Sequence, residues 1–257
     1  MTLTGAANLV AADLVHIRTN GTRLSALAEA ISQNPEVNDA YVALFGAVRL
    51  SPALVSGKSI LVTSTAPGEG KTTVASCLAI TASLAGQTVL LIDGDLRQSA
   101  LASAVGIAGA IGLTEILFGE AVVTEGIHPL TLFGRSPRAA LVNVMAGGKK
   151  SPMVLPAVDW PKARTAFQSI SQKFDVVLLD SPPILAANDA LLLASVVDAV
   201  LLVVGAGSAN LDELRRAKEL LEQTGTPVIG AVLNRFEPKI HGQSNQPYRG
   251  YYRRSQP

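Results

Sequence analysis

Cysteine, aromatic residues and charge are all scarce in this chain. Its one cysteine, Cys77, excludes an internal disulfide and makes a cysteine-based metal cluster implausible, so we expect a small buried residue of a helix. Aromatic residues make up 4% and charged residues 16% of the chain, and the formal net charge is +1. Such a balance provides no global field that would attract a polyanion. Nucleic-acid binding is therefore not expected.

Long apolar runs are also missing. No stretch approaches the roughly 18 residues that a membrane-spanning helix needs. The first residues lack the basic start and apolar block of a secretory signal, so a cytoplasmic location is expected. Hydrophobic residues nevertheless make up 48% of the sequence, which is enough to form a packed core.

The chain divides into three parts by its pattern. Residues 1–57 carry two helical patterns, at 24–31 and 37–50, and are expected to form an N-terminal helical extension. Residues 58–236 alternate short apolar runs with helices, and residues 237–257 have the composition of a disordered tail. We expect strands at residues 60–63, 88–93, 142–145, 175–180, 199–204 and 227–234, and helices at residues 73–84, 157–172 and 210–222.

The apolar runs predict the fold class. Runs such as VLLI and VVLL do not alternate with polar residues, which indicates strands covered on both faces, as in a mostly parallel sheet. We therefore predict an α/β fold with a doubly wound, mostly parallel sheet. Residues 106–150 are rich in glycine, and only a short helix at 113–119 can be assigned there.

The segment STAPGEGKTT, residues 64–73, predicts a phosphate-binding loop. A strand before it and a helix after it would aim backbone N–H groups and a helix N-terminus at one point. Thr65 stands where the strict GxxxxGK[ST] pattern has its first glycine, so the prediction depends on this context. The expected nucleotide-binding residues are Pro67, Gly68, Glu69, Gly70, Lys71, Thr72 and Thr73.

Three aspartates follow two buried strands. Asp93 and Asp95 lie in LLIDGDLR, and Asp180 closes the run VVLLD. Ligands bind beyond the carboxyl ends of parallel strands, so these acids should face the same phosphates. We expect Lys71, Asp93, Asp95 and Asp180 to be catalytic, with Thr72, Asp95 and Asp180 as Mg²⁺ ligands. Asp93 would orient the acceptor hydroxyl and take its proton late, unless it is only a helix cap at the end of its strand.

Three of the four tyrosines, Tyr248, Tyr251 and Tyr252, fall within the last ten residues. An exposed tyrosine is costly unless its hydroxyl has a use. Acceptor hydroxyls and a phosphoryl-donor site therefore occur in one molecule, which predicts a kinase that phosphorylates its own tail.

APGEGKTT, LLIDGDLR, LLDSPP and the tyrosine-bearing tail together resemble the bacterial tyrosine kinases, the P-loop autokinases of capsule and exopolysaccharide assembly. The resemblance implies a deviant-Walker, MinD-like fold, dependence on ATP and Mg²⁺, and tail autophosphorylation between subunits. It also implies a transmembrane polysaccharide co-polymerase adaptor of the Wzz type, which recruits the kinase to the inner face of the plasma membrane, and a phosphotyrosine phosphatase. Asn234 and Arg235 match the region where relatives contact adenine.

One family feature is replaced in this chain. Relatives often carry Glu-x-x-Arg-x-x-Arg on the helix before the core, whereas residues 39–45 read DAYVALF. Self-association is expected, but a closed ring of the usual kind is not.

Two other classes stay open at this point. A ParA- or MinD-like ATPase would switch its dimerisation without phosphorylating protein, although it typically has a lysine at the position of Ala66. A nucleotide-sensing regulator would bind without catalysis. Phosphotyrosine in the product separates a kinase from both.

Overall fold

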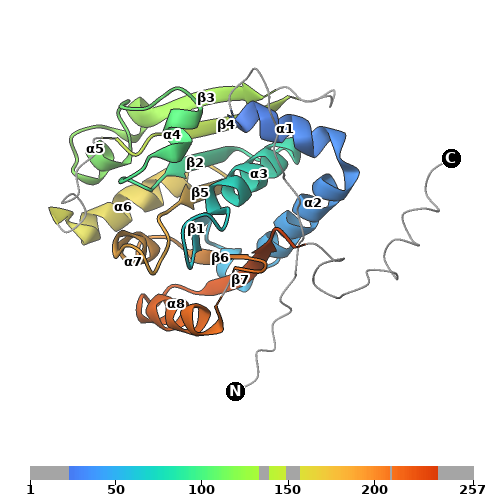
Figure 1. Ribbon diagram of the computed structural model, residues 1–257. Coiled ribbons are helices and arrows are strands. Elements are labelled where there is room, and N and C mark those ends of the chain that lie inside the picture. Colours follow the sequence, from blue (N-terminus) through green and yellow to red (C-terminus); the bar gives the residue numbers. More distant parts are fainter. Residues whose placement is uncertain (1–22, 133–138, 149–156, 209, 237–257) are drawn as a thin grey trace.

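A central seven-stranded sheet organises the computed structural model, which describes residues 23–132, 139–148, 157–208 and 210–236 (Figure 1). The strand order is β3-β4-β2-β5-β1-β6-β7, and every pair of neighbours is parallel except β3 and β4. The strands are β1 (Ser59–Ser64), β2 (Val89–Asp93), β3 (Ile127–Leu132), β4 (Ala140–Met145), β5 (Val176–Asp180), β6 (Ala199–Gly205) and β7 (Val228–Asn234).

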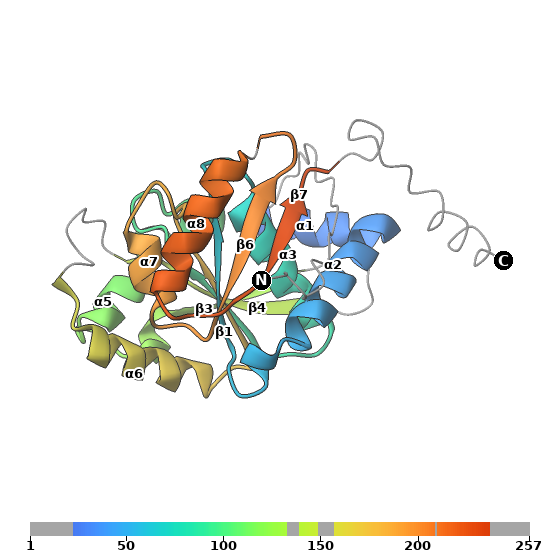
Figure 2. The same cartoon turned by 90° about the horizontal axis from the view of Figure 1, so that it is seen from below.

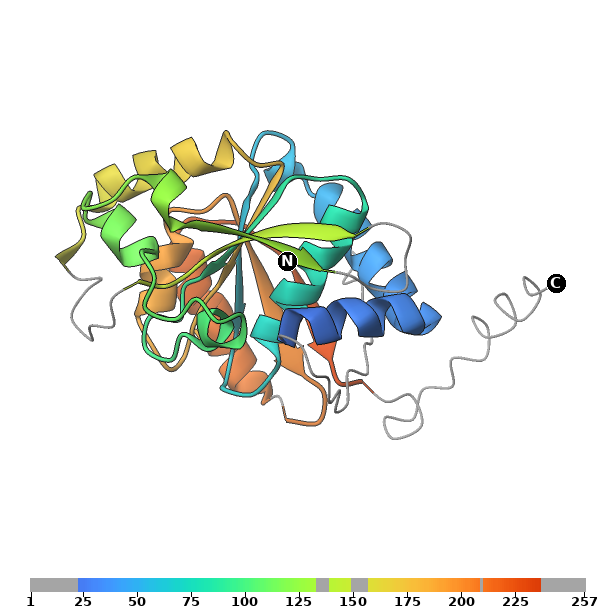
Figure 3. The same ribbon diagram turned by 90° about the horizontal axis from the view of Figure 1, so that it is seen from above.

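Helices cover both faces of the sheet (Figures 2 and 3). One hydrophobic cluster contains residues of α1 (Arg23–Gln33), α2 (Pro35–Arg49), α3 (Lys71–Leu84) and α4 (Ala100–Ala104). The other contains residues of α5 (Leu113–Leu117), α6 (Trp160–Ser171), α7 (Asp189–Ala194) and α8 (Leu211–Gln223). Two short 3-10 helices, Pro52–Leu54 and Val123–Gly126, complete the described elements. The predicted doubly wound α/β fold is confirmed.

Strand β2 illustrates how the sequence produces these two layers. Val89 and Leu91 contribute to the cluster on one face, and Leu90 and Ile92 to the cluster on the other. Successive side chains of a strand point to opposite faces, so a continuous apolar run fits only a strand covered on both sides.

Besides the two 3-10 helices, the sequence pattern does not predict one strand and two α-helices. Strand β3 pairs antiparallel with β4 at the sheet edge, where Pro129 is tolerated because an edge strand needs fewer backbone donors. Only Leu132 of its six residues is buried, so the apolar signal is weak. Helices α4 and α7 have five and six residues, too few to reveal a helical period.

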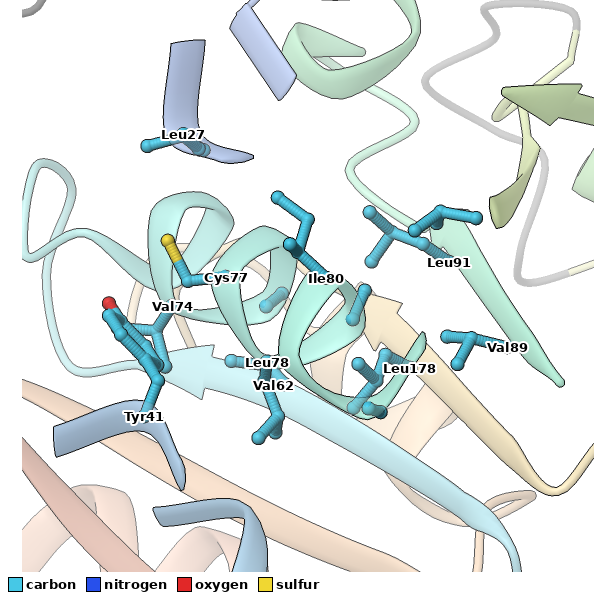
Figure 4. Packing of buried hydrophobic residues seen from close by; sticks show 14 of the residues in the cluster. Leu27, Tyr41, Val62, Val74, Cys77, Leu78, Ile80, Val89, Leu91 and Leu178 are labelled. Carbon is cyan, nitrogen blue, oxygen red and sulfur yellow. The ribbon is translucent and has the colours of Figure 1, made fainter. Parts of the chain in front are cut away.

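The N-terminal helices share a core with the sheet. Tyr41 of α2 is 1% exposed and packs beside Val74 and Cys77 of α3 (Figure 4). Burial raises the pKa of Cys77 to about 12, so the thiol behaves as the small buried residue expected from the sequence. The helices of the predicted extension and the following residues therefore form one hydrophobic core.

The parallel strands bring the chemically interesting residues to one end of the sheet. Strands β1, β2, β5 and β7 end at Ser64, Asp93, Asp180 and Asn234, and all four run in the same direction. Within the described ranges, no helix is both long and apolar enough to cross a membrane.

Replacing Tyr41 tests the shared core. We expect Tyr41→Ala to lower the free energy of unfolding by about 3–5 kcal/mol, because it leaves a cavity between α2 and α3. The exposed neighbour Val42, with 52% of its surface accessible, provides the control. Chemical denaturation should show a single transition for both variants and less than about 1 kcal/mol of change for Val42→Ala. A Tyr41→Ala protein as stable as the control would contradict the packing described.

Candidate active site

The loop between β1 and α3 is held from within by Glu69. This side chain is 3% exposed, and its Oε2 accepts hydrogen bonds from the Thr65 hydroxyl and the Ala66 amide, both at 2.8 Å. Its Oε1 accepts from the amide of Gly205, at the end of β6, at 3.0 Å. The carboxylate therefore fixes the shape of the loop and attaches it to the neighbouring strand, which leaves it no free oxygen to point at a ligand.

Asn234 supports the same loop from β7. Its Nδ2 donates to the carbonyl oxygen of Glu69 at 2.8 Å, and its side chain is buried. Gly70 lies against this amide with φ at +96°, and a Cβ at Gly70 would collide with the Asn234 nitrogen. Glycine is therefore required at position 70 by both backbone conformation and space.

Helix α3 begins at the loop without a side-chain cap. Gly70 occupies the N-cap position, and the first intrahelical bond runs from the Val74 amide to the Gly70 carbonyl. The amides of Lys71, Thr72 and Thr73 therefore precede the helical bonding pattern and concentrate partial positive charge. The Lys71 ammonium forms no ion pair within the described part of the chain. An anion, phosphate above all, would satisfy this helix end.

Asp180 ends β5 beside this helix and is 1% exposed. Among the described residues, its Oδ1 finds no hydrogen-bond partner. Burial raises the pKa of Asp180 to about 7, while the Thr72 hydroxyl and the positive charge of Lys71 act to lower it. A buried carboxylate oxygen without a partner is unfavourable unless a ligand completes it.

Asp93 ends β2, and its direct partner in the parallel register is Asp180. Its Oδ1 accepts from the Asp95 amide at 3.2 Å, and its Oδ2 accepts from the amide of Ala102, in α4, at 2.9 Å. Burial raises the pKa of Asp93 to about 6, the two amide bonds lower it, and the charge of Asp95 raises it. Both oxygens thus hold the turn that follows β2, as a helix cap would. Asp93 therefore has a structural task on both oxygens, in contrast to Asp180.

Gly94 lets the chain that follows β2 approach the end of β5 closely. Its amide donates to the Asp180 carbonyl at 2.6 Å, and a Cβ at this position would lie 2.6 Å from the same oxygen. Asp95 follows with 7% exposure, and its Oδ1 accepts from the Gln98 amide at 3.1 Å. Any side chain at position 94 would push the loop that carries Asp95 away from Asp180.

The residues present fit a magnesium ion only together with phosphate. Among the described residues, no group of three or more His, Cys, Asp or Glu side chains is placed to hold a metal by itself. Mg²⁺ typically takes one or two carboxylates and completes its octahedron with water and substrate phosphates. The unpartnered Asp180 oxygen and the adjacent Thr72 hydroxyl match that requirement.

The structure therefore gathers most of the predicted residues at one end of the sheet. Pro67 and Gly68 are exposed on the loop, and Arg235 is exposed beyond β7 with φ at +60°. Tyr248, Tyr251 and Tyr252 lie outside the described residues. Sequence reasoning did not identify Gly94, Gly205 or Ala102, because two act through backbone amides and one through its lack of a side chain.

The hydrogen bond that Asn234 donates to the loop can be tested by comparison with a second asparagine, Asn143, which makes a similar bond elsewhere. We expect Asn234→Ala to weaken ADP binding about 3- to 10-fold, because the loop loses the bond that fixes its Glu69 carbonyl. Asn143→Ala removes a similar bond, from Nδ2 to the Val89 carbonyl at 3.1 Å, within the sheet. Calorimetric titration should find unchanged ADP affinity for Asn143→Ala. Equal affinities in the two variants would show that the Asn234 hydrogen bond does not support the nucleotide-binding loop.

Burial of Asp180 predicts an unusual pH dependence of stability without ligand. An acid whose folded pKa is raised binds more protons when folded, so its ionisation destabilises the protein as pH rises from about 4 to about 7. Asp180→Asn should therefore stabilise the ligand-free protein relative to the parent by on the order of 3 kcal/mol at pH 8. The advantage should shrink at pH 5, as measured by thermal unfolding.

Asp175 provides the opposite case for the same measurement. Hydrogen bonds from the backbone and side chain of Thr88 lower its pKa, so its ionised form stabilises the folded state. Asp175→Asn should lose stability relative to the parent as pH rises. An Asp180→Asn variant that behaved in the same way would show that Asp180 is not a strained buried acid.

Comparison with known proteins agrees with this geometry. Residues 60–250 match the family model described as CobQ/CobB/MinD/ParA nucleotide binding domain. The chain is 31% identical over 197 residues to tyrosine-protein kinase YwqD of Bacillus subtilis, covering 76% of this chain and 77% of that protein.

A solved tyrosine kinase domain matches this chain more fully than a solved MinD ATPase does. The kinase domain of Escherichia coli tyrosine kinase ETK matches with a TM-score of 0.71 and 26% identity, covering 87% of this chain and 84% of that one. The cell division ATPase MinD of Pyrococcus furiosus has a TM-score of 0.59 and 26% identity, covering 76% and 79%. Fold, loop and relatives thus agree: the chain has a CobQ/CobB/MinD/ParA nucleotide binding domain and belongs to the bacterial tyrosine-protein kinases.

Proposed function

We propose that this tyrosine kinase transfers the γ-phosphoryl group of ATP, with Mg²⁺, to Tyr248, Tyr251 and Tyr252 of a second copy of the chain. Lys71 and the first-turn amides of α3 would bind the phosphates. Thr72, Asp95 and Asp180 would hold the cation. The observation that supports this most directly is the buried, unpartnered oxygen of Asp180 beside an uncapped helix start.

The reaction needs alignment and charge neutralisation more than it needs a strong base. A tyrosine oxygen bonds to the γ-phosphorus, the bond from that phosphorus to the β–γ bridging oxygen breaks, and ADP leaves. The phenolic proton departs late, to water. When bound, Mg²⁺ neutralises charge that develops on the phosphates.

Within this proposal the roles of the acids differ from the sequence-based expectation. Asp93 positions the turn that carries Asp95, because its oxygens are occupied by the amides of Asp95 and Ala102. Asn234 and Glu69 likewise act on the nucleotide by shaping the loop. Arg235, exposed and immediately after β7, is left as the candidate for contact with the base.

The position of β7 supports the tail as the substrate. This strand ends at Asn234, whose side chain contacts the phosphate loop. From there, the stretch to Tyr248 and Tyr252 could extend roughly 45–60 Å, which is enough to enter the site of a neighbouring molecule. Transfer between molecules also avoids the tight reversal that a tail would need to enter its own site.

The cellular role proposed here follows from the family. Phosphorylation of the tail would regulate the polymerisation and export of capsule or exopolysaccharide. A transmembrane co-polymerase adaptor would hold the kinase at the inner face of the plasma membrane and activate it, and a phosphotyrosine phosphatase would reverse the modification.

Mixing two complementary variants tests the transfer. Lys71→Met should bind nucleotide poorly but keep an intact tail, and a chain with all three tail tyrosines changed to phenylalanine should keep the catalytic site. With ATP, Mg²⁺ and activator, we expect mass spectrometry to find phosphotyrosine on the Lys71→Met chain only in the mixture. Alone, that variant should lose at least about 100-fold of the activity.

The same mixture, measured beside the wild-type chain alone, separates the alternatives. Phosphate on wild-type tails but none on the Lys71→Met chain in the mixture would place the transfer within one molecule. Nucleotide hydrolysis with unmodified tyrosines, even in wild type, would reject the tail as substrate and favour an ATPase switch.

A further inference from the structure

An arginine from outside the phosphate loop lies at the start of α3. Arg23 is the first residue of α1, and its Nη2 donates to the Thr73 hydroxyl at 3.3 Å. The two residues are separated by 50 positions in sequence. The predicted motifs contain no signal for this contact, since α1 belongs to the N-terminal helices.

Thr73 lies where the structure is prepared for phosphate. It follows Lys71 and Thr72 in the first turn of α3, before the first intrahelical bond closes at Val74. Its amide and hydroxyl therefore belong to the same uncapped helix end. A guanidinium beside this hydroxyl adds a full positive charge to the partial charges of the helix start.

Within the described ranges, no acid is paired with Arg23, and the arginine side chain is exposed. On its own helix, Glu29 instead accepts a hydrogen bond from Gln33 at 2.6 Å. An arginine without a carboxylate, held next to a helix end without a cap, is suited to recognising a phosphate through its planar set of N–H donors.

The packing of α1 keeps this arginine in place. Leu24, Leu27 and Ile31 are buried in the cluster that includes α3. The guanidinium also acts on the interior of this interface: burial raises the pKa of Cys77, whereas the nearby Tyr41 hydroxyl and the charge of Arg23 act to lower it. Arg23 is thus fixed relative to α3 by a hydrophobic contact rather than by a loop.

We propose that Arg23 binds a phosphate group of the nucleotide, so that α1 supplies a cation to the active site of its own chain. This inference rests on the proposed use of ATP. It assigns a binding role to the N-terminal helices in addition to packing. It also predicts that bound nucleotide restrains α1, since the ligand would bridge α1 and α3.

Binding measurements on Arg23 variants test this proposal. We expect Arg23→Ala to weaken Mg·ADP and Mg·ATP binding about 3- to 10-fold by calorimetry, because an exposed charge-assisted hydrogen bond is lost. Arg23→Lys should retain part of the affinity. Adenosine, measured by displacement of a fluorescent ADP analogue, should bind all variants equally, since it has no phosphate.

Arg49→Ala is the matched control, because it removes an exposed arginine from the same pair of helices at the far end of α2. It should bind nucleotide like wild type. Thermal unfolding without nucleotide should place both alanine variants within about 1 kcal/mol of wild type, as surface substitutions usually are.

Two results would overturn the proposal: unchanged affinity of Arg23→Ala for ADP and ATP, or an equal loss for adenosine. Neither bears on whether tail tyrosines receive phosphate. Conversely, unmodified tails in the mixing experiment, together with weaker ADP binding by Arg23→Ala, would reject the tail as substrate and leave the role of Arg23 intact.

Discussion

The phosphate loop depends on a buried carboxylate, Glu69, whose two oxygens both face donors of the protein. Glu69 lies inside the loop expected to bind a highly anionic triphosphate, where an ionised acid would repel its substrate. The structure avoids this conflict because Thr65, Ala66 and Gly205 donate to its two oxygens. Hydrogen bonds to a charged acceptor are among the stronger ones in proteins. The loop is thus shaped before a ligand arrives, and its outward donors stay available.

The rest of the site is, by contrast, left incomplete. Helix α3 starts without a side-chain cap, and Asp180 keeps one buried oxygen without a partner. Each feature is unfavourable alone, and a phosphate group with its cation would satisfy both. The loop is preorganised, whereas the helix start and Asp180 would gain partners only when a ligand binds. Binding would therefore add favourable contacts that the free protein lacks.

Much of this could be predicted from sequence, for identifiable reasons. Runs such as VLLI indicate buried parallel strands. A strand followed by a loop of small residues and a lysine indicates a phosphate-binding site. Strand β3 and helix α7 were missed because an edge strand is half exposed and a six-residue helix shows no period.

The roles of individual residues were harder to predict than their location. Glu69, Asp93 and Asn234 lie at the end of the sheet where the sequence predicts the site. What each side chain faces is decided by backbone amides and carbonyls that carry no sequence signal. The contact of Arg23 with Thr73 likewise depends on how α1 packs. The spacing of residues in a motif locates a site, whereas the orientation of each side chain within the site is set by tertiary structure.

Amide hydrogen exchange in the nucleotide-free protein tests the central claim, that Glu69 shapes the loop in advance. The amides of Ala66 and Gly205, both bonded to Glu69, should exchange slowly before any ligand is added, and faster in Glu69→Gln. If both amides exchanged as fast as in an unstructured peptide until Mg·ADP was supplied, the loop would be shaped by its ligand and the account would be wrong.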